Sequence, residues 1–370
     1  MDSEFARLID RIRAAAAQGA PLRIRGGDTK DFYGEQVQGE PLDTRRLAGV
    51  TDYEPSELVV TARAGTPLAE LEDLLAQRNQ CLPFEPPRFA GGGTVGGMVA
   101  AGLSGPARAS VGAVRDFVLG LRLVNGRGEH LAFGGQVMKN VAGYDVSRLM
   151  AGAMGMLGLI TEVSLKILPR APAEATLRFD CCQAEALRLL HGWGAQPLPL
   201  NASRWVEDGG AGVLFVRLRG AVAAVQAACR TMGGTPCRDD SVPRDWDDCR
   251  DQRLPWFTKG GGHDLWRLSV PQTAPVLDLP AAAGTPLVEW HGGLRWYRVP
   301  GDAGAAAALR AAAAQAGGHA TLFRAAPGAA AGTAAPRFAP LAPALARIHR
   351  ELRRQFDPAS IFNPGRMAAD

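Results

Sequence analysis

The chain has 370 residues, 46% of them hydrophobic and 21% charged, which is the composition of a folded globular protein and excludes a wholly disordered one. Its 41 lysines and arginines exceed its 37 acidic residues by only four, and no basic stripe is interleaved with aromatic residues, so nucleic acid is not expected as a partner. A chain of this length predicts two domains of ordinary size.

The sequence predicts a cytoplasmic protein without a transmembrane segment. Residues 1–18 mix acidic and basic residues at an apolar spacing that suits an amphipathic helix, and they lack the apolar core of a secretory signal. The longest nearly apolar stretch, Leu149–Ile160, is far shorter than the ~20 residues of a membrane span. Six cysteines form no C-x-x-C pair and no zinc or iron–sulfur spacing, so we expect reduced thiols and no metal site.

Short strands alternate with glycine-rich loops over the first 170 residues. Their patterns predict strands over 22–25, 58–62, 117–124 and 159–168, with a helix over 68–78. Asn125-Gly126 predicts a hairpin turn into a strand over 130–133.

The first glycine loop, Arg25-Gly26-Gly27-Asp28-Thr29-Lys30, follows a predicted strand. Adjacent glycines allow positive φ angles, and successive N–H groups can then form a nest for an anion such as a diphosphate. An ordinary glycine turn is equally compatible with this loop alone. Neither G-x-G-x-x-G nor a P-loop occurs, so the usual nucleotide fingerprints are missing.

Two further clusters follow. Residues 91–105 contain seven glycines, so a large flat ligand could lie against the backbone; a tightly packed small-residue helix is the structural alternative. The run 139–149 precedes a glycine-rich strand, and we expect its Tyr144, Asp145 and Arg148 to form a structural hydrogen-bond network instead of a catalytic group.

Residues 171–340 predict a second domain in which the order β-α-β-β-α occurs twice, as a weak internal repeat. It ends in an alanine-rich stretch, 303–335, whose last part, Pro327–Pro336, reads as a loop. A basic amphipathic helix over 341–356 and a tail containing Asn363-Pro364-Gly365 complete the chain.

The order of these motifs resembles the vanillyl-alcohol-oxidase-like family, whose FAD-binding domain is of the PCMH type. The matching runs are R-G-G-D-T-K, G-G-G-T-V-G-G-M-V-A-A-G-L-S-G, V-R-D-F-V-L-G-L-R-L-V-N-G-R-G-E, K-N-V-A-G-Y-D-V-S-R-L, G-M-L-G-L-I-T-E and F-D-P-A-S-I-F-N-P-G-R. Within that family, P-F-E-P-P, A-A-G-L-S-G-P and the cap run E-W-H-G-G-L-R-W are most similar to the FAD-binding subunits of bacterial glycolate oxidases.

The resemblance implies an α+β fold. Residues 1–170 would form a PCMH-type FAD-binding domain of two α+β subdomains, and 171–340 an α+β cap on the substrate side. Residues 341–370 would be a helix and an Asn-Pro-Gly tail that returns to the flavin.

The resemblance also implies which residues bind FAD. The diphosphate loop would be Arg25, Gly26, Gly27, Asp28, Thr29 and Lys30. The flavin and ribityl–phosphate region would be wrapped by Gly92, Gly93, Thr94 (as a hydrogen-bond donor), Val95, Gly96, Gly97, Gly102, Ser104 and Gly105. The nucleotide would lie beside Val111, Arg115 and Asp116, its adenine half against Gly155, Gly158 and Ile160, and the pyrimidine side of the isoalloxazine against Asn363.

Two departures from family patterns refine these expectations. Members that attach flavin covalently carry a histidine in the first loop, whereas this loop holds Asp28, Thr29 and Lys30, which implies non-covalent FAD. The catalytic flavin subunit of glycolate oxidase carries a group of histidines in its C-terminal part, whereas the six histidines here are scattered with no H-x-H.

The implied reaction is oxidation of a small 2-hydroxy acid to a 2-oxo acid, with hydride passing to the flavin while a base takes the hydroxyl proton. A carboxylate clamp needs an arginine, and His291 and Arg295 could share a site if a hairpin folds between them. The other candidates in the cap are Arg204, Arg267, Arg298 and His263.

The resemblance implies an FAD-binding subunit beside a catalytic flavin subunit and an iron–sulfur subunit. A peripheral location at the inner membrane, through those partners, stays open. A self-sufficient FAD-dependent dehydrogenase and a non-catalytic scaffold of the same fold stay open.

Overall fold

The computed structural model describes residues 3–135, 145–258, 261–327 and 335–367. The chain divides into two compact units. The first unit comprises Met1–Ser104, Ala113–Arg170 and Pro340–Asp370, and the second comprises Gly105–Gly112 and Ala171–Ala339. The segment Gly105–Gly112 was expected in the first domain, whereas its contacts place it in the second unit.

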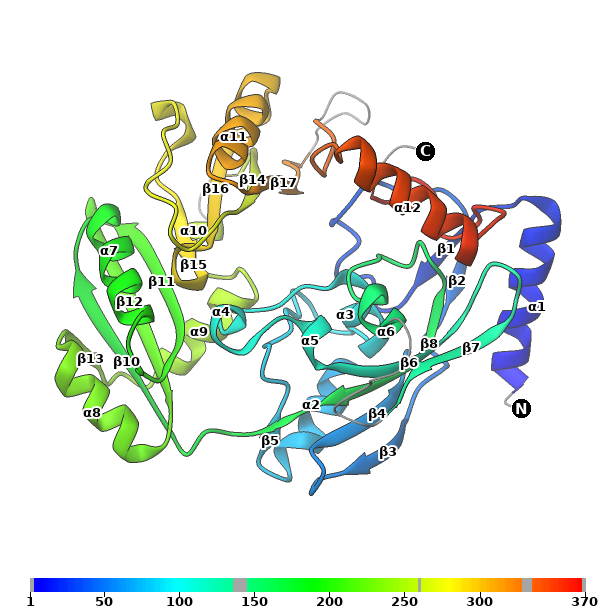
Figure 1. Cartoon of the computed structure of the whole chain (residues 1–370), viewed down its shortest axis with the longest axis horizontal. Coiled ribbons are helices and arrows are strands. Elements are labelled where there is room, and N and C mark those ends of the chain that lie inside the picture. Colours follow the sequence, from blue (N-terminus) through cyan, green and yellow to red (C-terminus); the bar gives the residue numbers. More distant parts are fainter. Residues whose placement is uncertain (1–2, 136–144, 259–260, 328–334, 368–370) are drawn as a thin grey trace. The chain divides into compact units, whose positions relative to one another are not determined.

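The first unit is built on a five-stranded antiparallel sheet with the strand order β3-β4-β8-β6-β7 (Figure 1). A parallel pair β1-β2 and a short pair β5-β9 accompany it. The elements are α1 (Ser3–Gln18), β1 (Leu22–Arg25), β2 (Glu40–Asp43), β3 (Val50–Glu54), β4 (Val59–Arg63), α2 (Leu68–Ala76), β5 (Gln80–Cys81), α3 (Val95–Ala101), α5 (Val114–Phe117), β6 (Val118–Val124), β7 (His130–Gly134), α6 (Val146–Met150), β8 (Leu159–Lys166), β9 (Leu168–Pro169) and α12 (Pro343–Phe356).

The hairpin predicted at Asn125-Gly126 joins β6 to β7, with Val124 paired to His130. Asn125 is buried, and its side-chain oxygen accepts hydrogen bonds from the N–H groups of Arg127 and Glu129. An asparagine side chain that imitates a backbone turn in this way explains why Asn-Gly is such a strong hairpin signal.

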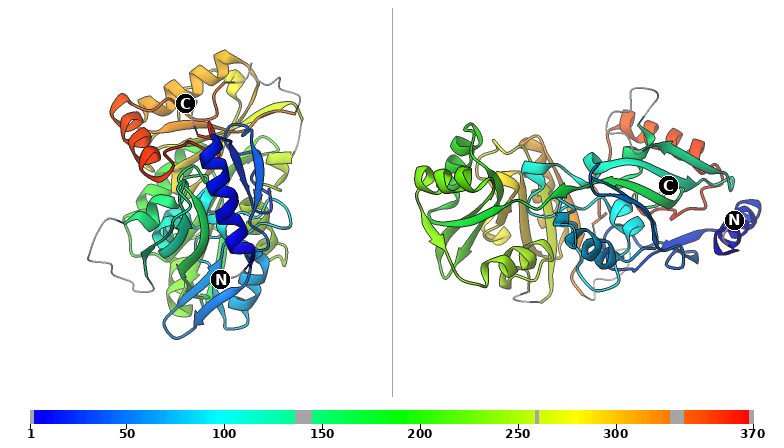
Figure 2. Two further views of the ribbon diagram at one scale, coloured as in Figure 1. Left: turned by 90° about the vertical axis from the view of Figure 1, so that its right-hand side faces the viewer. Right: turned by 90° about the horizontal axis from the view of Figure 1, so that it is seen from below.

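The two ends of the chain meet in one hydrophobic cluster. Helix α1 turns Leu8 and Ile12 toward β1 and β2, which lie alongside it in Figure 2, and Ile361 and Phe362 of the tail complete the cluster. The tail also pairs with β1, because Leu22 donates to the carbonyl of Ile361 at 2.7 Å. This packing brings a segment from the end of the sequence to the first strand.

The second unit contains an eight-stranded sheet with the order β13-β10-β12-β11-β15-β16-β14-β17. Its elements are α4 (Arg108–Val111), β10 (Ala173–Asp180), α7 (Gln183–Gly194), β11 (Leu200–Asp208), β12 (Ala211–Gly220), α8 (Val222–Met232), β13 (Thr235–Cys237), α9 (Val242–Arg250), α10 (Pro255–Thr258), β14 (His263–Ser269), the single turn η1 (Ala281–Ala283), β15 (Leu287–Glu289), the turn η2 (Trp290–Gly292), β16 (Leu294–Pro300), α11 (Ala303–Gln315) and β17 (His319–Arg324).

The strand order confirms an internal repeat in this unit and corrects its content. Each half of the sheet contains four strands that are consecutive in the chain. From the outer edge of the sheet inward, both halves have the order fourth, first, third and second strand, so β13-β10-β12-β11 mirrors β17-β14-β16-β15. Each half ends in a fourth strand that the βαββα pattern did not include. The second half has only the short turn η1 where the first half has α7, so the expected second copy of βαββα lacks its first helix.

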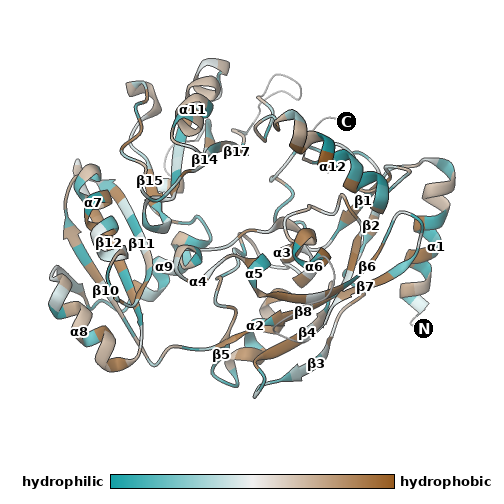
Figure 3. Ribbon diagram, in the orientation of Figure 1, coloured by the Kyte–Doolittle hydropathy of each residue, from teal (hydrophilic) through white to brown (hydrophobic). Residues whose placement is uncertain are grey.

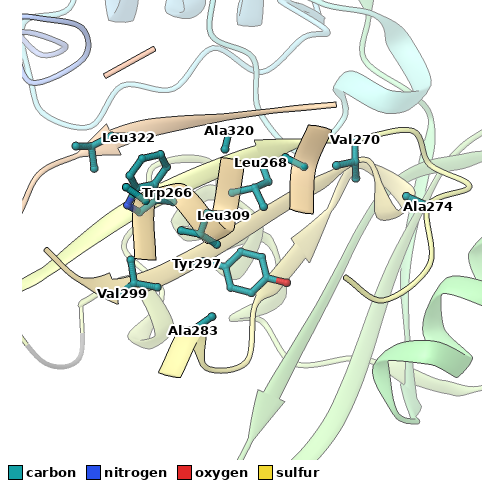
Figure 4. Packing of buried hydrophobic residues seen from close by; sticks show 12 residues of the cluster. Trp266, Leu268, Val270, Ala274, Ala283, Tyr297, Val299, Leu309, Ala320 and Leu322 are labelled. Atoms are coloured by element: carbon teal, nitrogen blue, oxygen red, sulfur yellow. The ribbon is translucent and has the colours of Figure 1, made fainter. Parts of the chain in front are cut away.

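Helices α7 and α8 pack on the first half of the sheet, and α11 packs on the second half. Figure 4 shows the second of these cores, in which Leu309 of α11 lies near Trp266 and Tyr297 of the sheet. Trp266 is 1% exposed and Leu309 is 1% exposed, so an alanine-rich helix is held here by few but fully buried large side chains.

The carboxylate of Asp357 anchors the C-terminal tail, and removing this carboxylate should loosen the tail. Asp357 is fully buried and accepts hydrogen bonds from the N–H groups of Ile361 (3.1 Å) and Phe362 (2.8 Å). We expect Asp357→Ala to lower the free energy of unfolding by roughly 1–3 kcal/mol, because two buried donors lose their acceptor. Urea unfolding measures this, with the exposed Glu351→Ala as control; equal midpoints for the two variants would contradict the role of Asp357.

Candidate functional site

An open cavity lies in the first unit, and we call it the first-unit cavity. Its walls come from β1 and the loop after it, from α3, from the loop before β8 and from the C-terminal tail. Twelve residues of the predicted FAD site line it, namely Gly26, Gly27, Asp28, Thr29, Lys30, Thr94, Gly96, Gly97, Gly155, Gly158, Ile160 and Asn363. Four distant stretches of the sequence therefore converge on one cavity.

Backbone-to-backbone contact between two glycine loops shapes this cavity. A Cβ on Gly27 would overlap the carbonyl oxygen of Gly92, and a Cβ on Gly26 would overlap Oγ1 of Thr94. Asp28, next in the loop, has a φ of 55°, in the left-handed region. Only glycine lets the loop after β1 approach the loop before α3 so closely.

Helix α3 begins at the cavity with a side-chain cap. Thr94 Oγ1 accepts a hydrogen bond from Gly97 N at 3.2 Å, which leaves the hydroxyl proton of Thr94 to donate. Gly96 packs against Ala64, which directly follows β4. A Cβ on Gly96 would lie 2.7 Å from that of Ala64. The small residues of α3 are thus required both by the sheet behind the helix and by the cavity in front of it.

Asn363 holds the tail against the cavity wall. Its side-chain oxygen accepts from Ile24 N at 2.8 Å, and its Nδ2 donates to the carbonyl of Met154 at 2.7 Å. A Cβ on Gly155 would lie 2.7 Å from that same Nδ2. One asparagine therefore joins β1, the loop before β8 and the tail.

Arg366 was missed by the sequence analysis as a site residue. It lines the cavity and donates to the carbonyls of Lys30 (3.3 Å), Asp31 (3.0 Å) and Glu35 (3.1 Å), which fixes the path of the loop after β1. The signal available in the sequence was its place directly after Asn-Pro-Gly. Also not predicted as lining were Arg23, Ile24, Asp31, Val37, Thr44, Ala64, Ala100, Ala101 and Met154.

The charges around the loop after β1 favour an anion. Arg25 pairs with Asp28, which raises the pKa of Arg25, and Asp31 lies 3.6 Å from both Arg23 and Arg366. Three of the charged side chains that line the cavity are cations (Arg23, Lys30 and Arg366) and two are carboxylates (Asp28 and Asp31), which leaves a surplus of one positive charge. A diphosphate is negatively charged, so the surplus has the sign that would favour it.

The other predicted FAD residues do not line the first-unit cavity. Gly105 and Val111 belong to the second unit. Arg115 and Asp116 are exposed, and Asp116 accepts from Ala113 N to cap α5. The remaining predicted residues do not line the cavity either: Arg25, Gly92, Gly93, Val95, Gly102 and Ser104.

Tyr144 lies outside the described residues, as do Lys139–Gly143 of the same motif and much of the predicted loop Pro327–Pro336. Within the described part of that motif, Asp145 caps α6 by accepting from Arg148 N and forms an ion pair with the Arg148 guanidinium at 3.1 Å.

His291 is a buried neutral residue in the second unit. Its ring nitrogens lie 3.0 Å from Ser203 Oγ and 2.9 Å from Ser110 Oγ. Burial lowers its pKa to about 4, so the ring is neutral at pH 7 and its two nitrogens are already engaged. Trp290 and His291 both adopt left-handed backbone conformations, with φ of 53° and 56°, which is costly for non-glycine residues.

Arg295 is engaged by main-chain carbonyls, which argues against the expected carboxylate clamp beside His291. Its side chain is fully buried, and its guanidinium donates to the carbonyls of Gly292 (3.2 Å), Pro275 (2.6 Å) and Ala274 (2.7 Å). These bonds engage each of the three guanidinium nitrogens. Arg295 instead pins the loop that replaces the missing helix of the second half.

Two other arginines of the second unit stack on aromatic rings. Arg204, which is 6% exposed, lies 4.7 Å from the ring centre of Phe215 and 5.5 Å from that of Trp246. Arg267 lies 5.1 Å from the ring of Trp290. Such stacking stabilises a guanidinium inside a protein, and the buried carboxylate of Glu289 also interacts electrostatically with both arginines.

The part of the chain that the structure describes contains neither a metal-binding cluster nor a membrane-spanning helix. No group of three or more histidine, cysteine, aspartate or glutamate side chains there is placed to hold a metal ion. None of the described helices is long and apolar enough to cross a bilayer.

The fold and the cavity define a protein of the FAD-binding class, and the comparisons with known proteins agree. The FAD binding domain model matches residues 4–134. The alkyldihydroxyacetonephosphate synthase structure shares the fold over 97% of this chain and 74% of its own, with a TM-score of 0.67 at 15% identity.

The chain belongs to the family of the glycolate oxidase subunit GlcE. It is 43% identical to that subunit of Escherichia coli K12 over 363 residues, which are 98% of this chain and 97% of the relative. More distant matches cover less than half of this chain: the D-lactate dehydrogenase of Archaeoglobus fulgidus is 30% identical over 43% of this chain and 36% of its own length. The glycolate oxidase subunit GlcD of Bacillus subtilis is 31% identical over 36% of this chain and 28% of its own length.

The residues of the first-unit cavity fit FAD. Glycines bare the main chain on one wall, where a Cβ would collide with the opposite loop, and Arg23, Lys30 and Arg366 supply positive charge to the same cavity.

Because Gly27 must approach Gly92, we expect Gly27→Ala to weaken FAD binding by at least about tenfold. The visible absorbance of the purified variant and its titration with FAD measure this. Gly192→Ala is the matched control, since a Cβ there meets nothing within 4 Å. Circular dichroism of both variants shows that they are folded, and full flavin content in a folded Gly27→Ala would refute the close-approach argument.

The buried His291 should make stability depend on pH. Its pKa is about 4 in the folded protein and near 6.5 when unfolded, so only the unfolded chain takes up a proton between these values. The free energy of unfolding should therefore fall as the pH drops from 6.5 to 4, by at most about 1.4 kcal/mol per pH unit from this residue.

Replacement His291→Asn, which tolerates the left-handed backbone, should flatten that slope. His130 and His319 also have lowered pKa values through burial, so the difference from the wild type is the quantity to measure. His349→Asn on the exposed side of α12 serves as control, and identical slopes for all three proteins would show that His291 does not titrate as stated.

Proposed function

We propose that this chain is the FAD-binding subunit of a heteromeric glycolate oxidase, which converts a 2-hydroxy acid to a 2-oxo acid and passes the electrons through flavin to an iron–sulfur partner subunit. The observation that carries the proposal is the similarity to the GlcE subunit over 98% of the chain. The first-unit cavity supports it independently, since its shape and charge suit a flavin dinucleotide.

Three groups of residues would hold FAD. The N–H groups of the loop from Gly26 to Lys30 would bind the diphosphate, with Lys30 and Arg23 adding charge. Thr94 would donate its hydroxyl proton to the cofactor. Asn363 would keep the tail closed on the cavity wall.

We propose that FAD is bound without a covalent bond. The described residues that line the cavity include no histidine and no cysteine, which are the side chains suited to nucleophilic attachment of a flavin ring. The positions in the loop after β1 are instead occupied by Asp28, Thr29 and Lys30. Binding would then rest on main-chain donors, charge and shape.

The chemistry that FAD supplies when bound is acceptance of two electrons from an alcohol carbon. A base and a carboxylate clamp are needed beside it. His291 and Arg295 are each engaged by other protein groups, which argues against both roles for them. We therefore propose that a companion flavin subunit completes substrate oxidation, and that this chain holds its flavin for electron transfer.

Purification of the chain alone, followed by anaerobic addition of excess glycolate or D-lactate, tests this proposal. We expect a yellow protein whose visible spectrum is not bleached until the companion subunits are added. Bleaching by the chain alone would indicate a self-sufficient dehydrogenase and defeat the subunit proposal. A colourless protein that takes up no FAD would indicate a scaffold.

The same sample tests the mode of attachment. Precipitation with acid should release all of the flavin into the supernatant, because nothing but non-covalent contacts would hold it. Flavin that stays with the precipitate would contradict non-covalent binding.

A further inference from the structure

Helix α12 carries an apolar row that is only partly covered. Leu345, Ile348, Leu352 and Phe356 follow one another at helical spacing, so they share one face. Phe356 is half-buried and stacks edge-on with Phe133 of β7, with ring centres 6.2 Å apart. Leu345 and Ile348, by contrast, are 49% and 51% exposed. The helix is thus attached at its C-terminal end and presents its N-terminal half.

Exposed large hydrophobic residues are concentrated at this helix. Six such side chains are exposed in the described part of the chain, and three of them are Leu341, Leu345 and Ile348. The other three are isolated in sequence, at Leu149, Val222 and Val276. Scattered exposed residues need no explanation, whereas a contiguous row is typical of an interaction surface. Figure 3 shows hydrophobic and hydrophilic segments alternating along α12.

The polar part of the same helix is strongly basic. Arg347, Arg350 and Arg354 are exposed, against a single acidic residue, Glu351, which lies 3.4 Å from Arg354. Interaction with the helix dipole explains arginine in the last turn, but not Arg347 and Arg350 in the middle of the helix. The surface therefore combines aliphatic anchors with a positive rim.

We propose that this face of α12 docks into an acid-rimmed apolar groove on a companion subunit of the oxidase. Leu345, Ile348 and Leu352 have the i, i+3, i+7 spacing with which amphipathic helices fill such grooves, and the exposed Leu341 lies just before the helix. The arginines on the rim would meet carboxylates there, which aligns the helix and speeds association. The inference rests on the proposed function, since it presumes that companion subunits exist.

Two other occupants suit the helix less well. A second copy of α12 would bring Arg347 and Arg350 against their own equivalents, and like charges disfavour that contact. An anionic membrane would attract the arginines, but Leu345 and Ile348 are the large hydrophobic residues that the helix leaves exposed, since Phe356 is turned to β7, and two side chains offer little apolar area for insertion.

The test uses the full-length chain, tagged at its N-terminus and co-expressed with its companion subunits in the native host. Companions that co-purify are identified by mass spectrometry as a second FAD-binding protein and an iron–sulfur protein. We expect the double variant Leu345→Asp/Ile348→Asp to recover about tenfold less of them than the wild type. Arg347→Glu/Arg350→Glu should also lower recovery, and its effect should shrink in high salt.

The matched control is Val222→Asp on α8, because Val222 is 49% exposed, close to the exposure of Leu345. Flavin content and thermal unfolding of every variant are measured first, so that a misfolded variant is not mistaken for a docking defect. Equal recovery of companions by the α12 variants and the wild type would overturn the docking assignment while leaving the proposed function intact.

The remaining outcomes also decide between the alternatives. A wild-type chain that recovers no companion at all would contradict the proposed function itself. A wild-type dimer in size-exclusion chromatography that becomes monomeric in Leu345→Asp/Ile348→Asp would assign the face to self-association and overturn the proposal. Co-sedimentation with phosphatidylglycerol vesicles that is lost in the same variant would assign it to a membrane and overturn it equally.

Discussion

The contact of Gly27 with Gly92 is the constraint on which the first-unit cavity depends. Two loops, separated by more than sixty residues in the chain, approach so closely that no side chain fits between them. Gly26 and Gly27 therefore present main chain instead of side chains to the cavity. Arg366 reinforces the arrangement by binding three carbonyls of the loop after β1, and Asn363 ties the tail to β1 itself. Without this close approach, the N–H groups and the positive surplus would not face one common space.

Many of the residues that form this cavity could be predicted from the sequence, because they belong to short sequence motifs. Adjacent glycines after a strand, a glycine cluster that begins a helix, and Asn-Pro-Gly in the tail are all short motifs with known backbone consequences. What the sequence could not provide was the partner of each part. The contact of Gly27 with Gly92 and the bonds of Arg366 depend on distances between segments far apart in the chain, which periodicity does not encode.

In the second unit, the sequence did not reveal the roles of the buried polar side chains. The first three strands of each half were predictable from alternation, whereas the fourth strands, β13 and β17, were missed and the strand order became known only from the structure. The replacement of a helix by the turn η1 left a loop that had to be held in another way. Arg295 holds it by donating to carbonyls 20 and 21 residues away. An arginine that satisfies backbone carbonyls and one that clamps a substrate carboxylate look identical in a sequence, since both need only a guanidinium. The same holds for His291, whose nitrogens meet two serines that the sequence places 88 and 181 residues away.

These two observations bear on how the work of oxidation is divided. A cofactor site needs little beyond exposed main chain and a positive surplus, and one compact unit of this chain contains both. Catalysis needs titratable groups that are poised and unengaged, whereas burial lowers the pKa of His291 to about 4 and the guanidinium of Arg295 binds three main-chain carbonyls. The proposed flavin site, together with these engaged side chains, supports the proposal that this chain carries electrons for another subunit's chemistry. Such a chain must associate stably with that subunit, and a row of exposed aliphatic residues rimmed by arginines is the kind of surface that association requires.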